Sequence, residues 1–287
     1  MSKAIDKVMQ AVFFICGLIT IACVFVITIY LIISGLPAIK EIGIADFLLG
    51  KQWASTAKEP LYGILPFILT SIFGTFGAIL LGVPVGFFTA VYLSKFAPEK
   101  VKKSIGFVVS LLASIPSVVY GLVGMMVLVP AVRKTFHISD GATLFSAIIV
   151  LAIMILPSII NVSITALDAV PKSYEAGALA LGATECETYF RVSVPAAKSG
   201  IMASIVLGVG RAIGEAMAVM MVSGNVANMP TLFGSVRFLT TAVASEMSYA
   251  LGLQKQALFS IALVLFVFIM LINWGLRKVM RGSDVKV

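Results

Sequence analysis

Two oppositely charged residues, Arg211 and Glu215, lie in an otherwise apolar stretch of the sequence. A charge at the centre of a membrane-spanning helix costs roughly 2.5 to 3.5 kcal/mol, so such residues are functional candidates by default. The spacing of four places both on one face of a helix, within ion-pairing reach. The planar fork of an arginine suits bidentate recognition of a tetrahedral oxyanion. The pair is therefore a candidate translocation site, with a structural pair that neutralises itself as the alternative.

Glycine surrounds these two charges. Gly208, Gly210 and Gly214 flank them in the sequence. Because glycine has no side chain, backbone can approach closely at these positions, or a pathway can open beside the arginine.

The chain as a whole is strongly apolar. Of its 287 residues, 60% are hydrophobic and 12% are charged, whereas soluble domains average roughly 25% charged residues. This composition excludes a soluble globular protein and a disordered one. The net charge of +8 comes from basic residues between apolar runs, without the basic stripe of a nucleic-acid-binding surface. The sequence predicts a protein that binds the lipid bilayer and no nucleic acid.

Windows without charge indicate which helices must position the pair. A helix needs about 20 residues to cross the hydrocarbon core. The fold class predicted is all-α, a polytopic membrane protein with one transmembrane domain over 1–287. Six transmembrane helices are expected, at 8–39, 60–94, 104–132, 141–167, 199–223 and 256–276. The fifth of them holds the two charges.

Basic residues orient these spans. With the N-terminus inside, 13 Lys and Arg residues fall in inner segments and seven in outer ones. Basic residues accumulate on the cytoplasmic side of membrane proteins. We therefore expect both termini in the cytoplasm.

The sequence offers no residues for covalent catalysis or metal binding. It contains no glycine-rich phosphate loop, no Cys and His metal spacing and no Ser, His and Asp set. Its three cysteines do not suggest a disulfide scaffold. We expect a non-enzymatic chain without metal or cofactor of its own, driven by an ion gradient or by another subunit.

The longest inner connection, 165–198, has the pattern of two short helices. The stretches 173–181 and 185–190 favour helix, and between them lies Gly182, which can adopt a positive φ. Pro195 is expected to stop the second helix before the next span. An exposed helical turn with small residues suits insertion into another protein's cleft.

This loop resembles the cytoplasmic coupling loop, the EAA loop, of bacterial ABC importer permeases. That pattern reads Glu-Ala-Ala, three residues, Gly, nine residues and Ile-x-Leu-Pro. Counting from Gly182 places the Ile-x-Leu-Pro positions on 192–195 and the Glu-Ala-Ala positions on 176–178. The nearest acidic residue, Glu175, therefore lies one position before the glutamate of the pattern. An amphipathic loop on the membrane surface is the alternative. The resemblance implies that the loop docks onto an ATPase subunit through a set of residues: Glu175, Ala176, Gly177, Gly182 and Pro195.

Two further runs, IPSVVYGLVGMMVLVP at 115–130 and GRAIGEAMAVMMVSGN at 210–225, resemble the PstC-type permeases of phosphate-specific ABC importers. The resemblance extends over nearly the whole chain. It implies a MetI-like permease core in the cell inner membrane that forms half of a phosphate pathway, with Arg211 and Glu215 in transport. It also implies a PstA-type permease as heterodimer partner, two PstB-type ATPases that bind ATP and Mg, and a PstS-type phosphate-binding protein.

Other functions remain open at this point. Arginine alone does not discriminate phosphate from sulfate, molybdate or tungstate. An ion-coupled secondary transporter would use Arg211 and Glu215 as a proton relay, and a scaffold for phosphate signalling would bind partners without transport. If phosphate passes Arg211, we expect Glu215 to compete for the guanidinium and so prevent the anion from being held too tightly.

Overall fold

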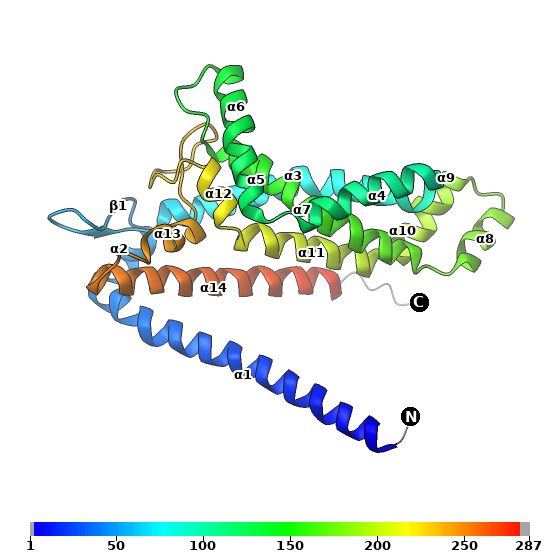
Figure 1. Ribbon diagram of the computed structural model, residues 1–287, viewed down its shortest axis with the longest axis horizontal. Coiled ribbons are helices and arrows are strands. Elements are labelled where there is room, and N and C mark those ends of the chain that lie inside the picture. The colour runs from blue at the N-terminus through cyan, green and yellow to red at the C-terminus, as the bar shows by residue number, and fades with distance from the viewer. Residues whose placement is uncertain (1–2, 282–287) are drawn as a thin grey trace.

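The computed structural model describes residues 3–281, so the two ends of the domain predicted over 1–287 lie outside the described part. Most of the helices run along one long axis (Figure 1). The α-helices, in order, are α1 (Lys3–Ile42), α2 (Ile44–Leu49), α3 (Leu65–Val91), α4 (Glu99–Ser114), α5 (Ser117–Val123), α6 (Val129–Phe136), α7 (Leu144–Asp168), α8 (Lys172–Ala180), α9 (Glu185–Thr188), α10 (Val194–Ala196), α11 (Lys198–Gly214), α12 (Met217–Val222), α13 (Leu239–Glu246) and α14 (Gly252–Arg281). Three π-helical turns join some of them: η1 (Tyr92–Phe96), η2 (Gly124–Leu128) and η3 (Tyr189–Ser193).

One short hairpin departs from the expected all-α pattern. Strand β1 (Trp53–Ala54) pairs antiparallel with β2 (Leu61–Tyr62), and Trp53 lies opposite Tyr62. The two rings meet edge to face with centroids 5.5 Å apart, and both side chains are buried. The Trp53 ring also packs against the ring of Phe67 in α3, with centroids 5.6 Å apart, and this contact anchors the hairpin on the helical body.

The membrane spans agree largely with the uncharged windows. Within residues 3–281, five helices are long and apolar enough to cross a membrane: Ile5–Ile42, Leu65–Phe96, Ser117–Phe136, Leu144–Asp168 and Gly252–Leu276. A sixth span results if the bent pair Glu185–Ala196 and Lys198–Gly214 is counted as one. The polytopic, helical fold class is thereby confirmed.

The third predicted span, 104–132, is wrong in its course. Helix α4 ends before Ile115, whose backbone is extended, and α5 begins directly after Pro116. Proline pushes the preceding residue out of the helical conformation, which explains the break. Beyond it the chain leaves the direction of α4, and α6 stands out from the bundle (Figure 1). The Tyr120 hydroxyl bridges the break by donating to the Leu112 carbonyl at 2.7 Å.

Two π-helical turns accommodate prolines inside helical runs. Turn η2 ends two residues before Pro130, and η3 ends two residues before Pro195. A proline ring clashes with the carbonyl four residues earlier, and a wider turn relieves that clash. The helical run extends one residue beyond Pro195 and ends at Ala196, so the predicted stop before the next span is confirmed, although Pro195 itself does not break the helix. The chain bends instead at Ala197, where the segments on either side meet at 69°.

Helix α7 occupies the centre of the bundle, where α3, α11 and α4 pack against it. Its buried residues include Leu151, Met154 and Ile155. A Cβ atom at Gly82 of α3 would lie 2.7 Å from the Ile155 side chain, so glycine permits this close approach. By contrast, α1 contacts mainly α14 and α2, diverges from α14 toward its own first residues, and exposes most of its apolar side chains (Figure 1).

Candidate functional site

The helix that carries Arg211 ends before it reaches Glu215. Helix α11 ends at Gly214, and Glu215 has an extended backbone with φ −74° and ψ 128°. Its carbonyl accepts a hydrogen bond from the Thr240 hydroxyl at 2.8 Å, which replaces the bond that a continuing helix would make. The ion pairs among the described residues do not join the two charges. The prediction that both charges lie on one helical face is therefore wrong, and the alternative, a structural ion pair between them, does not form in the described part of the chain.

Glu215 instead fixes the start of α12. Its carboxylate accepts a hydrogen bond from the backbone N–H of Ala218 at 3.0 Å. A negative charge is favourable at the N-terminus of a helix, where backbone N–H groups lack helical partners. The charge of Glu215 thus has a structural use that does not involve the arginine.

Arg211 lies in the last turn of α11, where a positive charge is favourable. Its Nη1 donates to the Ser158 hydroxyl of α7 at 3.4 Å, and both residues are half-buried. Within residues 3–281 no carboxylate forms an ion pair with this guanidinium. Most of its donors are therefore available to an anion.

The glycines next to Arg211 differ in their surroundings. A Cβ atom at Gly208 would approach Ile159 of α7 to 3.1 Å, so this glycine serves helix packing. Gly210 and Gly214 have open space at the same position, with no atom within 4 Å. Two of the three glycines thus leave open space on the same stretch of α11 as the arginine, whereas the third serves the close approach that was the other expectation.

The connection 165–198 contains the two helices that its sequence predicts, α8 and α9. Gly182 between them has φ +86°, the positive value expected for the turn. A capping box begins α9, because the Thr184 hydroxyl accepts from the Glu187 N–H and the Glu187 carboxylate accepts from the Thr184 N–H. The loop lies at one end of the molecule (Figure 1).

Most of the residues predicted to dock an ATPase are exposed on this loop. Ala176, Gly177, Gly182 and Pro195 are exposed, and neither glycine has an atom within 4 Å of its missing Cβ. Leu181, beside them, is 91% exposed. Ala176, Gly177, Leu181 and Gly182, on α8 and the turn after it, form a projecting surface of small and apolar groups, which we call the docking surface.

Glu175 does not belong to the docking surface, because its carboxylate points inward. It accepts from the Lys95 ammonium at 2.6 Å and from the Ser193 hydroxyl at 2.8 Å. Burial raises the pKa of Glu175, but the hydrogen bonds from Lys95 and Ser193 outweigh it, so the pKa lies below its ordinary value. Sequence reasoning missed both partners. The one available signal was the position of Glu175, one residue away from the EAA register.

A second network, which is partly buried, lies at the opposite end of the bundle. Arg237 forms an ion pair with Glu246, and its Nε and Nη2 donate to the Asn225 carbonyl at 3.0 and 2.8 Å. The Glu246 carboxylate also accepts from Trp53 Nε1 at 3.2 Å and from Gln254 Nε2 at 3.0 Å. This network ties the hairpin to α13 and α14.

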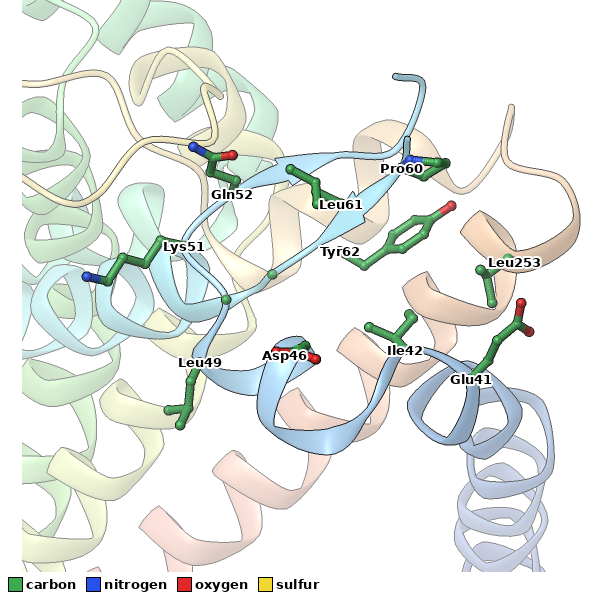
Figure 2. Close-up of a pocket in the computed structure, with 12 residues that line it drawn as sticks. Glu41, Ile42, Asp46, Leu49, Lys51, Gln52, Pro60, Leu61, Tyr62 and Leu253 are labelled. Atoms are coloured by element: carbon green, nitrogen blue, oxygen red, sulfur yellow. The ribbon is translucent and has the colours of Figure 1, made fainter. Parts of the chain in front are cut away.

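A cleft of about 770 Å³ lies beside the hairpin (Figure 2). Glu41 and Tyr62 lie near one of its sides, close to Leu253, and Lys51 projects on the other (Figure 2). Asp46 also lines it, so the wall carries charges of both signs.

A bundle of membrane-length helices with a half-buried arginine inside it and an exposed helical loop at one end defines a subunit of a membrane transporter. Residues 82–282 match the family described as binding-protein-dependent transport system inner membrane components. The chain belongs to this family, and the resemblance to ABC importer permeases is confirmed.

Individual relatives agree with this assignment. The chain is 40% identical over 268 residues to the probable ABC transporter permease protein YqgH of Bacillus subtilis, covering 90% of this chain and 87% of that protein. It is 35% identical over 261 residues to the phosphate transport system permease protein PstC of Haemophilus influenzae, covering 84% and 82%. The inward-facing MetNI methionine ABC transporter has the same fold, with a TM-score of 0.62 at 18% identity, covering 77% of this chain and 96% of that one. The MetI-like core is therefore confirmed.

Proposed function

We propose that this chain is the permease subunit of an ATP-driven, binding-protein-dependent importer of inorganic phosphate, and that it forms half of the translocation pathway. The observation that carries this proposal is the half-buried Arg211 guanidinium, which binds only the neutral Ser158 hydroxyl among the described residues. The relative named PstC supports phosphate as the substrate.

Arg211 would lower the barrier that an anion meets inside the bilayer. A charge-assisted bond to an anion is roughly twice as strong as a neutral one, and the guanidinium fork fits two oxygens of one phosphate. Open space at Gly210 and Gly214 leaves room for the ion next to this group. Because Glu215 is bonded to the start of α12, it acts as a helix cap in this proposal and does not compete for the guanidinium.

The energy for import would come from a partner. The docking surface suits the cleft of a cytoplasmic ATPase of the PstB type, two copies of which would bind ATP and Mg. A PstA-type permease would complete the pathway, and a PstS-type binding protein would deliver phosphate.

The location proposed is the cell inner membrane, with both termini in the cytoplasm. Helix α1 begins and α14 ends toward the end of the bundle that holds α8 (Figure 1). If α8 meets a cytoplasmic ATPase, both chain ends lie on the same side of the membrane as that ATPase.

Reconstitution of the four components in liposomes tests this function. We expect ATP-driven uptake of labelled phosphate that Arg211→Ala reduces by at least about tenfold, the loss expected for hydrogen bonds to a charged group. Arg211→Lys keeps the charge without the fork and should retain part of the uptake. Binding of the ATPase should not change in either variant.

Three outcomes would contradict the proposal, in the role of Arg211, in the substrate or in the source of energy. Uptake by Arg211→Ala equal to that of the unmodified chain would remove the arginine from the pathway. Preferred uptake of labelled sulfate, molybdate or tungstate would change the substrate. Uptake driven by an ion gradient without any ATPase would make the chain a secondary transporter.

A further inference from the structure

Three side chains from distant parts of the sequence form one cluster at the inner end of the bundle. Lys95 belongs to η1, Glu175 to α8 and Ser193 to η3. The ammonium and the hydroxyl both donate to the same carboxylate oxygen of Glu175, at 2.6 and 2.8 Å. The side chains of Lys95 and Glu175 are only 10% and 19% exposed, so water screens this ion pair much less than a surface pair.

A pair of aromatic rings lies beside the cluster. The Lys95 ammonium lies 5.9 Å from the centre of the Tyr189 ring, a cation–π distance. That ring meets Phe96 edge to face, with centroids 5.0 Å apart. Turn η1 is thus attached to η3 by the rings and to α8 by the ion pair.

The ion pair matters because α8 has few other attachments. Its main contacts are with α9 and η3, both of which belong to the same loop. On its outer side, Gly177 and Leu181 face open space. Turn η1, in contrast, continues directly from α3, which packs along the central helix α7. Lys95 therefore connects the loop to a helix that crosses the bundle.

We propose that the ion pair between Lys95 and Glu175 makes α8 and the inner end of α3 move as one body. Glu175 is then a positioning residue inside the permease, and the contact with the ATPase is made by the docking surface. This inference rests on the proposed function, because it assigns the route by which movement of the loop reaches the membrane helices.

A charge exchange tests the link in the reconstituted complex. The variants are Lys95→Glu, Glu175→Lys and the double variant that carries both. The control is Lys102→Glu, which makes the same charge change on the same inner face. Lys102 pairs with Asp168 at 3.5 Å, and those side chains are 36% and 44% exposed. Phosphate taken up per ATP hydrolysed and the amount of ATPase bound are measured for each.

We expect each single variant to lower phosphate uptake per ATP by at least about fivefold, because one buried charge is left facing another of the same sign. The ATPase should remain bound, since the docking surface is unchanged. The double variant should regain at least half of the unmodified ratio, and Lys102→Glu should behave like the unmodified chain. Single variants with an unchanged ratio, or a double variant as poor as the single ones, would overturn the link.

A chemical crosslink provides a second test that does not need the exchanged charges to pack. Lys95→Cys and Glu175→Cys are combined in a chain whose Cys16, Cys23 and Cys186 are replaced by Ser. We expect low uptake per ATP before treatment, recovery after a short reversible thiol crosslinker joins the two positions, and loss again on reduction. Crosslinked protein that stays uncoupled would contradict a rigid link.

The unmodified complex separates this inference from the proposed function. If it takes up no phosphate on ATP addition, the proposed function fails whatever the variants do. If it transports and every variant keeps the unmodified ratio, only the link between α8 and α3 fails.

Discussion

The Arg211 guanidinium and the Glu215 carboxylate, four residues apart, bind different helices because α11 ends between them. Arg211 donates to Ser158 of α7, whereas Glu215 accepts from the Ala218 N–H of α12. Each charge also lies at the helix end that favours its sign, the arginine at a C-terminus and the glutamate at an N-terminus. Their proximity in the sequence therefore does not make them one functional unit.

The first prediction concerns Glu215→Gln. The glutamine side chain keeps an oxygen that can accept from the Ala218 N–H, so the start of α12 should persist. We expect phosphate uptake within about twofold of the unmodified chain, a difference of under about 0.5 kcal/mol. ATP-driven uptake in liposomes measures it. A loss comparable to that of Arg211→Ala would show that the negative charge itself acts in transport.

Glu215→Ala is the matched variant that removes the cap altogether. Loss of a capping side chain costs about 1 kcal/mol. We therefore expect a lower midpoint of thermal unfolding in detergent for Glu215→Ala than for Glu215→Gln. Equal midpoints would contradict the capping role.

The second prediction concerns the contact between Arg211 and Ser158. This hydrogen bond is long, at 3.4 Å, and should contribute at the lower end of the usual range. We expect Ser158→Ala to raise the phosphate concentration for half-maximal uptake by about two- to threefold, equivalent to about 0.5 kcal/mol. The maximal rate should change little, since the guanidinium stays in place. A maximal rate as low as that of Arg211→Ala would mean that the Ser158 hydroxyl itself binds phosphate during transport.

The extent to which the sequence predicts this structure depends on whether a feature is local. Long uncharged windows indicate membrane helices because the bilayer excludes charge over a fixed thickness. Gly182 indicates the loop turn because few other residues tolerate its backbone conformation. These features depend on neighbouring residues, and the structure confirms them.

The features that the sequence did not predict depend on contacts between distant residues. The end of α11 at Gly214 is supported by Thr240, which is 25 residues beyond the carbonyl that it binds. Lys95 looks like any basic residue at the end of a span, and its partner Glu175 is 80 residues away. The break at Pro116 is the exception, because proline is a local signal whose effect inside membrane helices varies with the neighbours that re-satisfy the backbone.

The third prediction concerns the pKa of Glu175. Lys95 and Ser193 hold the pKa of this carboxyl below its ordinary value of 4.5 despite burial. In Lys95→Met the burial remains and the main stabilising charge is gone, so the pKa should rise relative to the unmodified chain. NMR titration of the labelled carboxyl carbon measures both values. An unchanged titration midpoint would show that the lysine does not stabilise the carboxylate.

The direction in which the pKa of Glu175 is shifted determines how the ion pair between Lys95 and Glu175 depends on pH. A carboxyl with a lower pKa in the folded state stabilises that state above the unfolded pKa and loses this contribution as the pH falls through the folded value. The pair should therefore be fully formed between pH 6 and 8 and weaken only below about 4.5. Uptake per ATP that changes between pH 6 and 8 in the unmodified chain, but not in Lys95→Met, would contradict this.

The fourth prediction concerns the network that attaches the hairpin to α13 and α14. In Glu246→Ala the Trp53 N–H loses its acceptor, and the partly buried Arg237 keeps only the Asn225 carbonyl. Removing one partner of such a pair leaves an uncompensated charge, so we expect destabilisation by at least about 2 kcal/mol. Glu59→Ala, an exposed position of the same hairpin, is the control and should have no effect.

Tryptophan fluorescence reports this change at the hairpin itself. Trp53 is 9% exposed, whereas Trp274 is 65% exposed, so Trp274→Phe leaves a single buried reporter. In that background Glu246→Ala should shift the emission of Trp53 to longer wavelength, because the hairpin separates from α13 and water reaches the indole. Glu246→Gln retains an acceptor for the Trp53 N–H without the charge, and should shift the emission less. If Glu246→Ala leaves the emission unchanged, the packing of Trp53 against Phe67 of α3 is enough to hold the hairpin, and the ion pair serves only α13.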